Sequence, residues 1–340
     1  MTATEEKRLA DTGERSPGYG PGRVWLSLFA GLAGILLLVA VEVTSDPAGR
    51  APAIRYTPPV RSGDDAVAVS PTVTFIVHPT VEKLQAAFAR AAYDLEVIRR
   101  MRTPVPRLRL VKLPRDLPEM LDVSERKTVF LSLVLPLILE ANAHISMERR
   151  RLRHAIERRA AGQKLPQEMK DWLAGVAKRY KGSPDRLDEL LLRVDTVPPS
   201  LVLAQAAAES GWGTSRFAIE GNAIFGQWTT TRGKGLVPLG RPEGETYKVR
   251  SFDRLIDSVN AYMRNLNTHR SYRGFRKLRA EMRDTGRPLD GAKLAGRLQR
   301  YSETGQEYVD LLRDIIRKNR LSPLDRATLG DTVIAFAWGV

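Results

Sequence analysis

A long apolar run near the start of the chain predicts a membrane anchor. Residues 24–43, VWLSLFAGLAGILLLVAVEV, carry one carboxylate, Glu42, near the far end. About 20 residues at 1.5 Å per residue match the thickness of a bilayer's hydrocarbon core. A cleaved signal peptide is the alternative, but the long leader and the lack of an A-x-A site just after the run favour a retained transmembrane helix.

Polar and turn-forming residues flank this run on both sides. Residues 1–23 are predicted to be a disordered cytoplasmic tail. Residues 44–73 are rich in proline, glycine, alanine and charge, which is typical of a linker.

Apolar residues at helical spacing then dominate the chain. They predict a helix from Thr80 to Met101, after which four prolines between residues 104 and 118 indicate extended backbone. Residues 74–123 are therefore expected to form an accessory helix and an extended segment.

A second apolar run covers residues 129–139, VFLSLVLPLIL. It is too short to cross a bilayer and contains Pro136, so it predicts a buried core helix with Ser124 as its N-cap. The basic stretch MERRRLRHAIERR, residues 147–159, predicts a further helix. Its charged face is expected to be solvated, with contact to a polyanion left open.

The remaining pattern is helical except at one place. A short helix is expected at residues 185–194, and Pro198, Pro199 and Ser200 are expected to cap the next one. Residues 235–252 read as a β-hairpin with a Gly/Pro-rich turn. The fold class predicted is mainly α with a small β-hairpin lobe, preceded by the transmembrane helix.

Composition excludes several kinds of chemistry. The 340-residue chain has no cysteine, which excludes disulfides, iron–sulfur clusters and thiolate nucleophiles. Its four histidines are far apart and form no metal-ligand pattern, and no Walker, G-x-S-x-G or G-x-G-x-x-G motif occurs. We expect no metal and no cofactor. The net charge of +15 favours an anionic partner.

The stretch AQAAAESGWG, residues 204–213, places one carboxylate at the end of a small-residue helix. Gln205 and Glu209 lie on one face at i, i+4 spacing, and the alanines allow neighbouring helices to approach closely. The negative end of the helix dipole, and dehydration by Trp212 or Phe217, would both raise the pKa of Glu209. A protonated glutamate suits general acid catalysis of glycoside hydrolysis. An interior salt bridge to Arg216 is the alternative.

Three stretches in order then carry a family resemblance: ESGWGTSRFAIEGNAIFGQW at 209–228, SVNAYMRNLNTHRSYRGFR at 258–276 and YSETGQEYV at 301–309. They resemble the bacterial glucosaminidase-domain proteins, glycoside hydrolase family 73, and most closely their Bax-like branch. The resemblance covers about residues 124–321, leaving 322–340 as a C-terminal tail. It implies a lysozyme-like fold with a groove between a helical lobe and a β-lobe.

The resemblance also implies roles for individual residues. Glu209 matches the general acid and Tyr301 the tyrosine of the catalytic centre, which would hold the substrate's 2-acetamido group or position water. Gln205, Asn222, Phe225, Trp228 and Tyr308 are expected to bind substrate. Packing is the alternative for Phe225 and Tyr308, and Trp212 is expected to pack against the helix end.

A second catalytic carboxylate is harder to assign. Glu245 is the first candidate, followed by Glu243 and Glu220. In parts of the family a hairpin glutamate falls several residues earlier, where this chain reads GLVPLG without an acid. The substrate's acetamido group, or water positioned by Tyr301, would then replace the base.

The resemblance implies a peptidoglycan hydrolase, an endo-β-N-acetylglucosaminidase that acts on the β-1,4 bonds of wall glycan strands. A lytic transglycosylase and a non-catalytic peptidoglycan-binding protein are the alternatives. The anchor predicts a single-pass protein of the bacterial inner membrane, and because the implied substrate lies outside the membrane, the catalytic domain is expected to be periplasmic or otherwise extracytoplasmic. No nucleic-acid partner is expected, because no recognition motif is present and an anchor argues against it.

Overall fold

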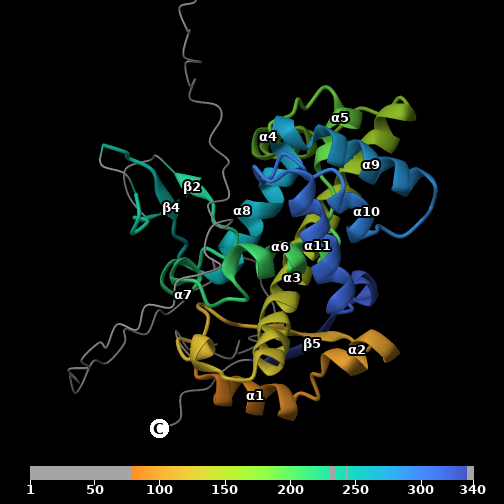
Figure 1. Ribbon diagram of the computed structural model, residues 1–340. Coiled ribbons are helices and arrows are strands. Elements are labelled where there is room, and N and C mark those ends of the chain that lie inside the picture. The colour runs from red at the N-terminus through yellow and green to blue at the C-terminus, as the bar shows by residue number, and fades with distance from the viewer. Residues whose placement is uncertain (1–78, 230–234, 242–243, 335–340) are drawn as a thin grey trace, which may run out of the picture.

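A computed structural model describes residues 79–229, 235–241 and 244–334 (Figure 1). The predicted tail, anchor and linker (1–23, 24–43 and 44–73) lie outside the described residues, as does Glu243. Within the described part the protein is mainly helical with two small sheets, which confirms the predicted class at that level.

The first helical region is divided in two, where the apolar pattern predicted a single helix. Helix α1 is Val81–Arg90 and helix α2 is Leu95–Met101. Between them Ala92 takes a left-handed conformation with φ 50°, and the Asp94 side chain accepts hydrogen bonds from the first backbone N–H groups of α2. By capping the start of a new helix, the Asp94 side chain competes with continuation of α1. The break depends on this polar residue, so the spacing of the apolar residues could not reveal it.

The long helix α3, Val123–Ala160, merges the predicted core helix with the basic helix after it. Its N-cap is Asp122 rather than Ser124, because the Asp122 carboxylate accepts from two backbone N–H groups. Pro136 lies inside the helix without ending it. The side chains of 129–139 are buried on all sides. Burial of the Val, Phe, Leu and Ile side chains among them contributes about 1.5–3 kcal/mol each, which together far exceeds the roughly 3 kcal/mol that an interior proline costs.

Among the described residues, α3 is the one helix that is long and apolar enough to cross a membrane, judged by length and composition alone. However, 78% of its most apolar window is buried inside the protein. The expectation of a core helix for 129–139 is therefore confirmed.

The second half of α3 packs against helices α4, Gln167–Tyr180, and α5, Leu187–Arg193, in a separate apolar cluster. Its basic side chains lie around the rim of that cluster, and Arg150 and Arg153 are exposed to solvent as expected.

Helix α6, Pro199–Ser210, lies at the centre of the main core (Figure 1). It contacts α3, the short helix α10 (Gly291–Ala295), α11 (Gln306–Lys318) and the 3-10 turn η3 (Ser322–Arg326). Its N-cap, Pro198, has no capping side chain. Asp325 of η3 fulfils that role by accepting from the backbone N–H and the hydroxyl of Ser200, at 2.7 and 2.8 Å.

The β-lobe follows helix α7, Arg216–Gly221, and projects to one side of the helices (Figure 1). Strands β3 (Gly235–Leu236) and β4 (Lys248–Arg250) pair antiparallel, which confirms pairing within the predicted hairpin. Strand β2, Trp228–Thr229, adds a third strand on the other side of β4. Helix α8 (Leu255–Thr268), turn η2 (Arg270–Tyr272) and helix α9 (Arg273–Asp284) lead back to the core.

A two-stranded parallel sheet joins the two ends of the described fold. Strand β1, Val105–Leu108, precedes turn η1 (Leu117–Glu119) and pairs with strand β5, Leu329–Ile334. The accessory segment and the residues expected as a C-terminal tail are thus held together, a pairing between distant segments that local sequence patterns could not indicate.

Candidate active site

Glu209 occupies the last turn of α6, and the chain turns sharply after it. Gly211, Trp212 and Gly213 all have positive φ values, of 57°, 60° and 80°. A Cβ atom at Gly213 would lie 2.7 Å from the ring of Phe130 in α3. Glycine is therefore required there both for its backbone conformation and for the close approach to α3.

The carboxyl group of Glu209 is largely removed from water. The residue is 7% exposed, and burial raises its pKa to about 7, against the smaller lowering effect of a hydrogen bond from Tyr308. The carboxyl end of α6 adds an unfavourable dipole for an anion. The raised pKa that the sequence predicted for Glu209 is thus confirmed.

Three further side chains form a buried hydrogen-bond chain behind this carboxyl. The hydroxyl of Tyr308 donates to Oε1 of Glu209 at 2.6 Å. The Nε2 group of Gln205 donates to the hydroxyl oxygen of Tyr308 at 3.0 Å, and the hydroxyl of Tyr262 donates to Oε1 of Gln205. These residues come from α6, α8 and α11, so the packing of three helices sets the geometry of the acid.

Aromatic rings surround this chain. Tyr301 stacks on Tyr308 with ring centroids 5.5 Å apart and packs edge-on against Tyr262 at 6.4 Å. Tyr272 lies 6.1 Å from Tyr301, and Phe225 stacks on Tyr262 at 4.0 Å. These rings are buried and exclude water from the wall behind the carboxyl group. Trp212 packs edge-on against Phe130 of α3, as expected for a residue at the helix end.

The salt-bridge alternative for Glu209 has no support in the described residues. Arg216 donates instead to Glu220 at 3.2 Å and to the carbonyl oxygen of Val237 at 2.7 Å. Among the described residues no hydrogen bond reaches Oε2 of Glu209. This oxygen faces Gly226, where a Cβ atom would stand 3.9 Å away.

The residues predicted to bind substrate occupy different positions. Gln205 and Phe225 are almost fully buried, and Tyr308 is 5% exposed, so all three form the inner wall of the site. Asn222 is also buried and donates to the carbonyl oxygens of residues 252 and 253, which ties α7 to the chain after β4. Trp228 is half-buried at the start of β2, with its ring edge-on to Tyr247.

The candidates for a second carboxylate are not part of this cluster. Glu245 is exposed just before β4, and no hydrogen bond joins it to the described side chains around Glu209. Glu220 is exposed and paired with Arg216. Glu245 remains a prediction from the sequence.

Sequence reasoning missed Tyr262 and Tyr272 as parts of the site. Tyr262 lies on the apolar face of α8 with Val259 and Leu266, so helical periodicity alone marks it as core. The available signal was that both tyrosines lie within the stretch 258–276, one of the three that carry the family resemblance.

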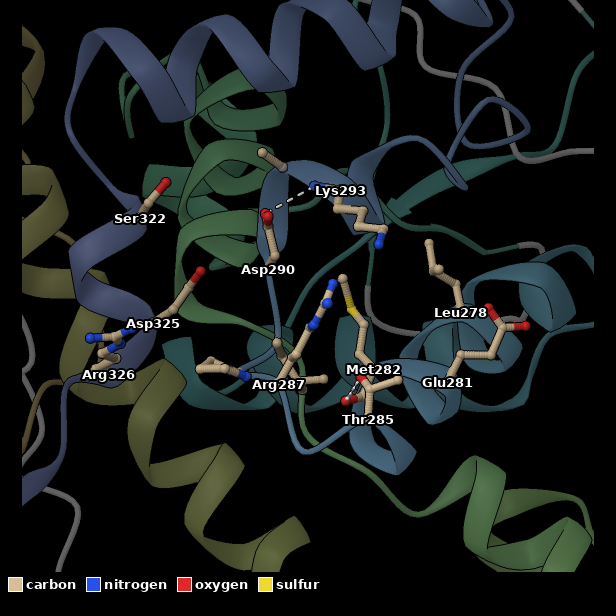
Figure 2. A pocket seen from close by; sticks show the side chains of 13 residues that line it. Leu278, Glu281, Met282, Thr285, Arg287, Asp290, Lys293, Ser322, Asp325 and Arg326 are labelled. Carbon is tan, nitrogen blue, oxygen red and sulfur yellow. Dashed lines mark hydrogen bonds between the residues drawn. The ribbon is translucent and has the colours of Figure 1, made fainter.

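A pocket of about 660 Å³ lies elsewhere, between α9, α10 and η3 (Figure 2). Arg287, Lys293 and Asp325 are among its lining residues, and it shares none with the cluster around Glu209. Because Asp325 binds Ser200 at the beginning of α6, the pocket adjoins the end of that helix opposite Glu209.

Comparisons with known proteins identify the family of the chain. Residues 189–321 match the glucosaminidase family model, described as mannosyl-glycoprotein endo-beta-N-acetylglucosaminidase, and contain Glu209 and all the residues of its cluster. The chain is 36% identical to Protein bax of Escherichia coli (strain K12) over 211 residues, which are 60% of this chain and 74% of that protein. No solved structure gives a significant match. The chain belongs to the glucosaminidase family, as a Bax-like glucosaminidase-domain protein.

Proposed function

We propose that the protein is a peptidoglycan hydrolase, an endo-β-N-acetylglucosaminidase that cleaves the β-1,4 bonds of wall glycan strands. The observation that carries this proposal is Glu209, a buried carboxyl with a pKa raised to about 7 and one oxygen left without a described partner. A carboxylic acid of this kind can give a proton to a leaving oxygen near neutral pH. The net charge of +15 suits an anionic wall.

In this mechanism Glu209 protonates the glycosidic oxygen as the bond to the anomeric carbon breaks. Tyr301, on the inner wall, is proposed to position the 2-acetamido group or the attacking water. Trp228 is proposed to contact the apolar face of a sugar ring, whereas Phe225 is almost fully buried and packs behind the site, as in the alternative stated for it. Glu245 remains the proposed general base, and assistance by the acetamido group is the alternative that needs no second carboxylate.

One observation favours a lytic transglycosylase as the second candidate. Within the described residues, the hydrogen-bonded cluster of the site holds a single carboxyl group, that of Glu209. A transglycosylase needs one acid and no activated water, because a hydroxyl of the sugar itself attacks the anomeric carbon and forms the 1,6-anhydro ring. Its product carries a 1,6-anhydro end instead of a new reducing end.

The test is incubation of the full chain with purified peptidoglycan, with the new ends identified by mass spectrometry. We expect reducing N-acetylglucosamine ends from the wild type and none from Glu209→Gln. Glu307→Gln, which changes an exposed carboxylate on α11, is the matched control and should cleave as the wild type does. Equal cleavage by Glu209→Gln would overturn the assignment of the acid. Binding without cleavage by the wild type would indicate a peptidoglycan-binding protein.

The predicted anchor at residues 24–43 would place the catalytic domain on the wall side of the bacterial inner membrane. Protease added to intact spheroplasts should then digest the domain, while a cytoplasmic marker survives. Protection of the domain until lysis would contradict this localisation.

A further inference from the structure

We propose that Gln205 and Tyr262 are positioning residues that fix the direction of the hydrogen bond from Tyr308 to Glu209, and so place the transferable proton of Glu209 on Oε2. This inference rests on the proposed role of Glu209 as general acid, and it gives Gln205 a role different from substrate binding.

The direction of these hydrogen bonds follows from the hydrogens that each group can donate. A phenol has one hydrogen, whereas an amide has hydrogens only on its nitrogen. Because the Tyr262 hydroxyl donates to Oε1 of Gln205, the amide turns its Nε2 group toward Tyr308. The Tyr308 oxygen accepts from that nitrogen, and its own hydrogen is left for Oε1 of Glu209.

The direction decides which carboxyl oxygen holds the proton. Since Oε1 of Glu209 accepts from Tyr308, the protonated acid carries its hydrogen on Oε2, beside Gly226. If the hydrogen bonds ran in the opposite direction, Tyr308 would donate to Gln205, and Glu209 would have to donate from Oε1 toward the helices. The proton would then point into the interior, away from any substrate.

Packing prevents water from replacing this series of hydrogen bonds. Gln205 and Tyr262 are both fully buried, and the Tyr262 ring is stacked on Phe225 with an interplanar angle of 11°. The i, i+4 spacing of Gln205 and Glu209 on α6 sets the amide and the carboxyl on the same face, with Tyr308 bridging them from α11.

Tyr262→Phe tests the inference, because it keeps the ring and removes the one hydroxyl that orients the amide. Without that donor the Gln205 amide turns over, its carbonyl accepts from Tyr308, and Tyr308 no longer donates to Glu209. We expect the pKa of Glu209 to rise by about one unit, the size of effect that a hydrogen bond to a charged group has. Tyr308→Phe should raise the pKa by a similar amount.

A second variant separates orientation from simple loss of contacts. Gln205→Met removes the amide, so Tyr308 has only Glu209 to donate to, and the pKa of Glu209 should stay near the wild-type value. The double variant Gln205→Met/Tyr262→Phe should return the pKa from the raised value toward the wild type. A purely structural role for Gln205 predicts the opposite, with the double variant at least as perturbed as either single one.

The measurement is a ¹³C NMR titration of the side-chain carboxyl in the full chain labelled at glutamate, with the Glu209 resonance identified by its loss in Glu209→Gln. Tyr93→Phe is the matched control, because its buried hydroxyl donates to the carbonyl oxygen of Ser132 in α3, away from these hydrogen-bonded groups, and it should cause no shift. An unchanged pKa in Tyr262→Phe, or no recovery in the double variant, would overturn the inference. The titration needs no turnover, so it stands apart from the product test of the proposed function.

Discussion

The Tyr308 hydroxyl donates a 2.6 Å hydrogen bond to Oε1 of Glu209, although the two residues are 99 positions apart in the chain. The bond favours the ionised carboxylate, while burial favours the neutral acid, and burial has the larger effect. The protonation of Glu209 therefore depends on how closely α11 packs on α6, and four consequences of this fold can be tested.

The first prediction concerns the pH dependence of glycan cleavage. A general acid must be protonated, so kcat/KM should fall tenfold per pH unit above the pKa of Glu209, which is about 7. The measurement is a pH profile on soluble glycan fragments. An upper limb centred near pH 4.5, the ordinary value for a glutamic acid, would mean that the carboxyl is solvated in the working enzyme.

The second prediction concerns stability. Because the pKa of Glu209 is 4.5 when unfolded and about 7 when folded, the unfolded chain loses its proton first as the pH rises. The free energy of unfolding therefore falls as the pH rises from the unfolded to the folded pKa. At about 1.4 kcal/mol per pH unit the total loss is roughly 3 kcal/mol. Glu209→Gln should gain that stability over the wild type at pH 8 and little at pH 4, as measured by urea unfolding. An equal effect at both pH values would contradict the raised pKa.

The third prediction concerns the turn after α6. A Cβ atom at Gly213 would lie 2.7 Å from Phe130 and 2.9 Å from Leu117, at a φ of 80°. Gly213→Ala should destabilise the fold by more than about 2 kcal/mol. Gly211→Ala is the control, since it meets only the Thr214 hydroxyl at 3.2 Å and should cost about 1 kcal/mol. Equal losses in chemical denaturation would show that the contact with α3 is easily relaxed.

The fourth prediction concerns the buried carboxylate just before α6. Burial alone would raise the pKa of Asp195, but the guanidinium groups of Arg279, Arg283 and Arg149 hold it below its usual value. Asp195→Asn leaves the fully buried Arg279 without a counter-charge, which should cost about 3–5 kcal/mol. Asp188→Asn, on the exposed face of α5, should change the unfolding midpoint very little.

The sequence predicted the burial and the raised pKa of Glu209 because local features determine them. Small residues along α6, a helix end and a glycine turn all surround Glu209 within a few positions, and together they indicate burial and a raised pKa. The hairpin pairing and the buried helix at 129–139 follow from local patterns in the same way.

The remaining features depend on contacts between distant segments. In the sequence, Gln205 is one polar residue on a helix face. Its role becomes visible only when α8 and α11 bring Tyr262 to its amide oxygen and Tyr308 to its amide nitrogen. Likewise, Ser200 looks like an ordinary cap, but the acceptor that completes the helix start is Asp325. Side-chain chemistry suggested which groups could interact, and tertiary packing selected which of them do.

The parallel pairing of β1 with β5 has a consequence for biosynthesis. Next to it, Arg99 donates to the carbonyl oxygen of Asn319, 220 residues later in the chain. The strand that pairs with β1 is therefore not made until nearly the whole chain has been synthesised. A site that needs α11 beside α6 is completed equally late, so a nascent chain, or one truncated before α11, lacks the hydrogen bond that Tyr308 donates to Glu209.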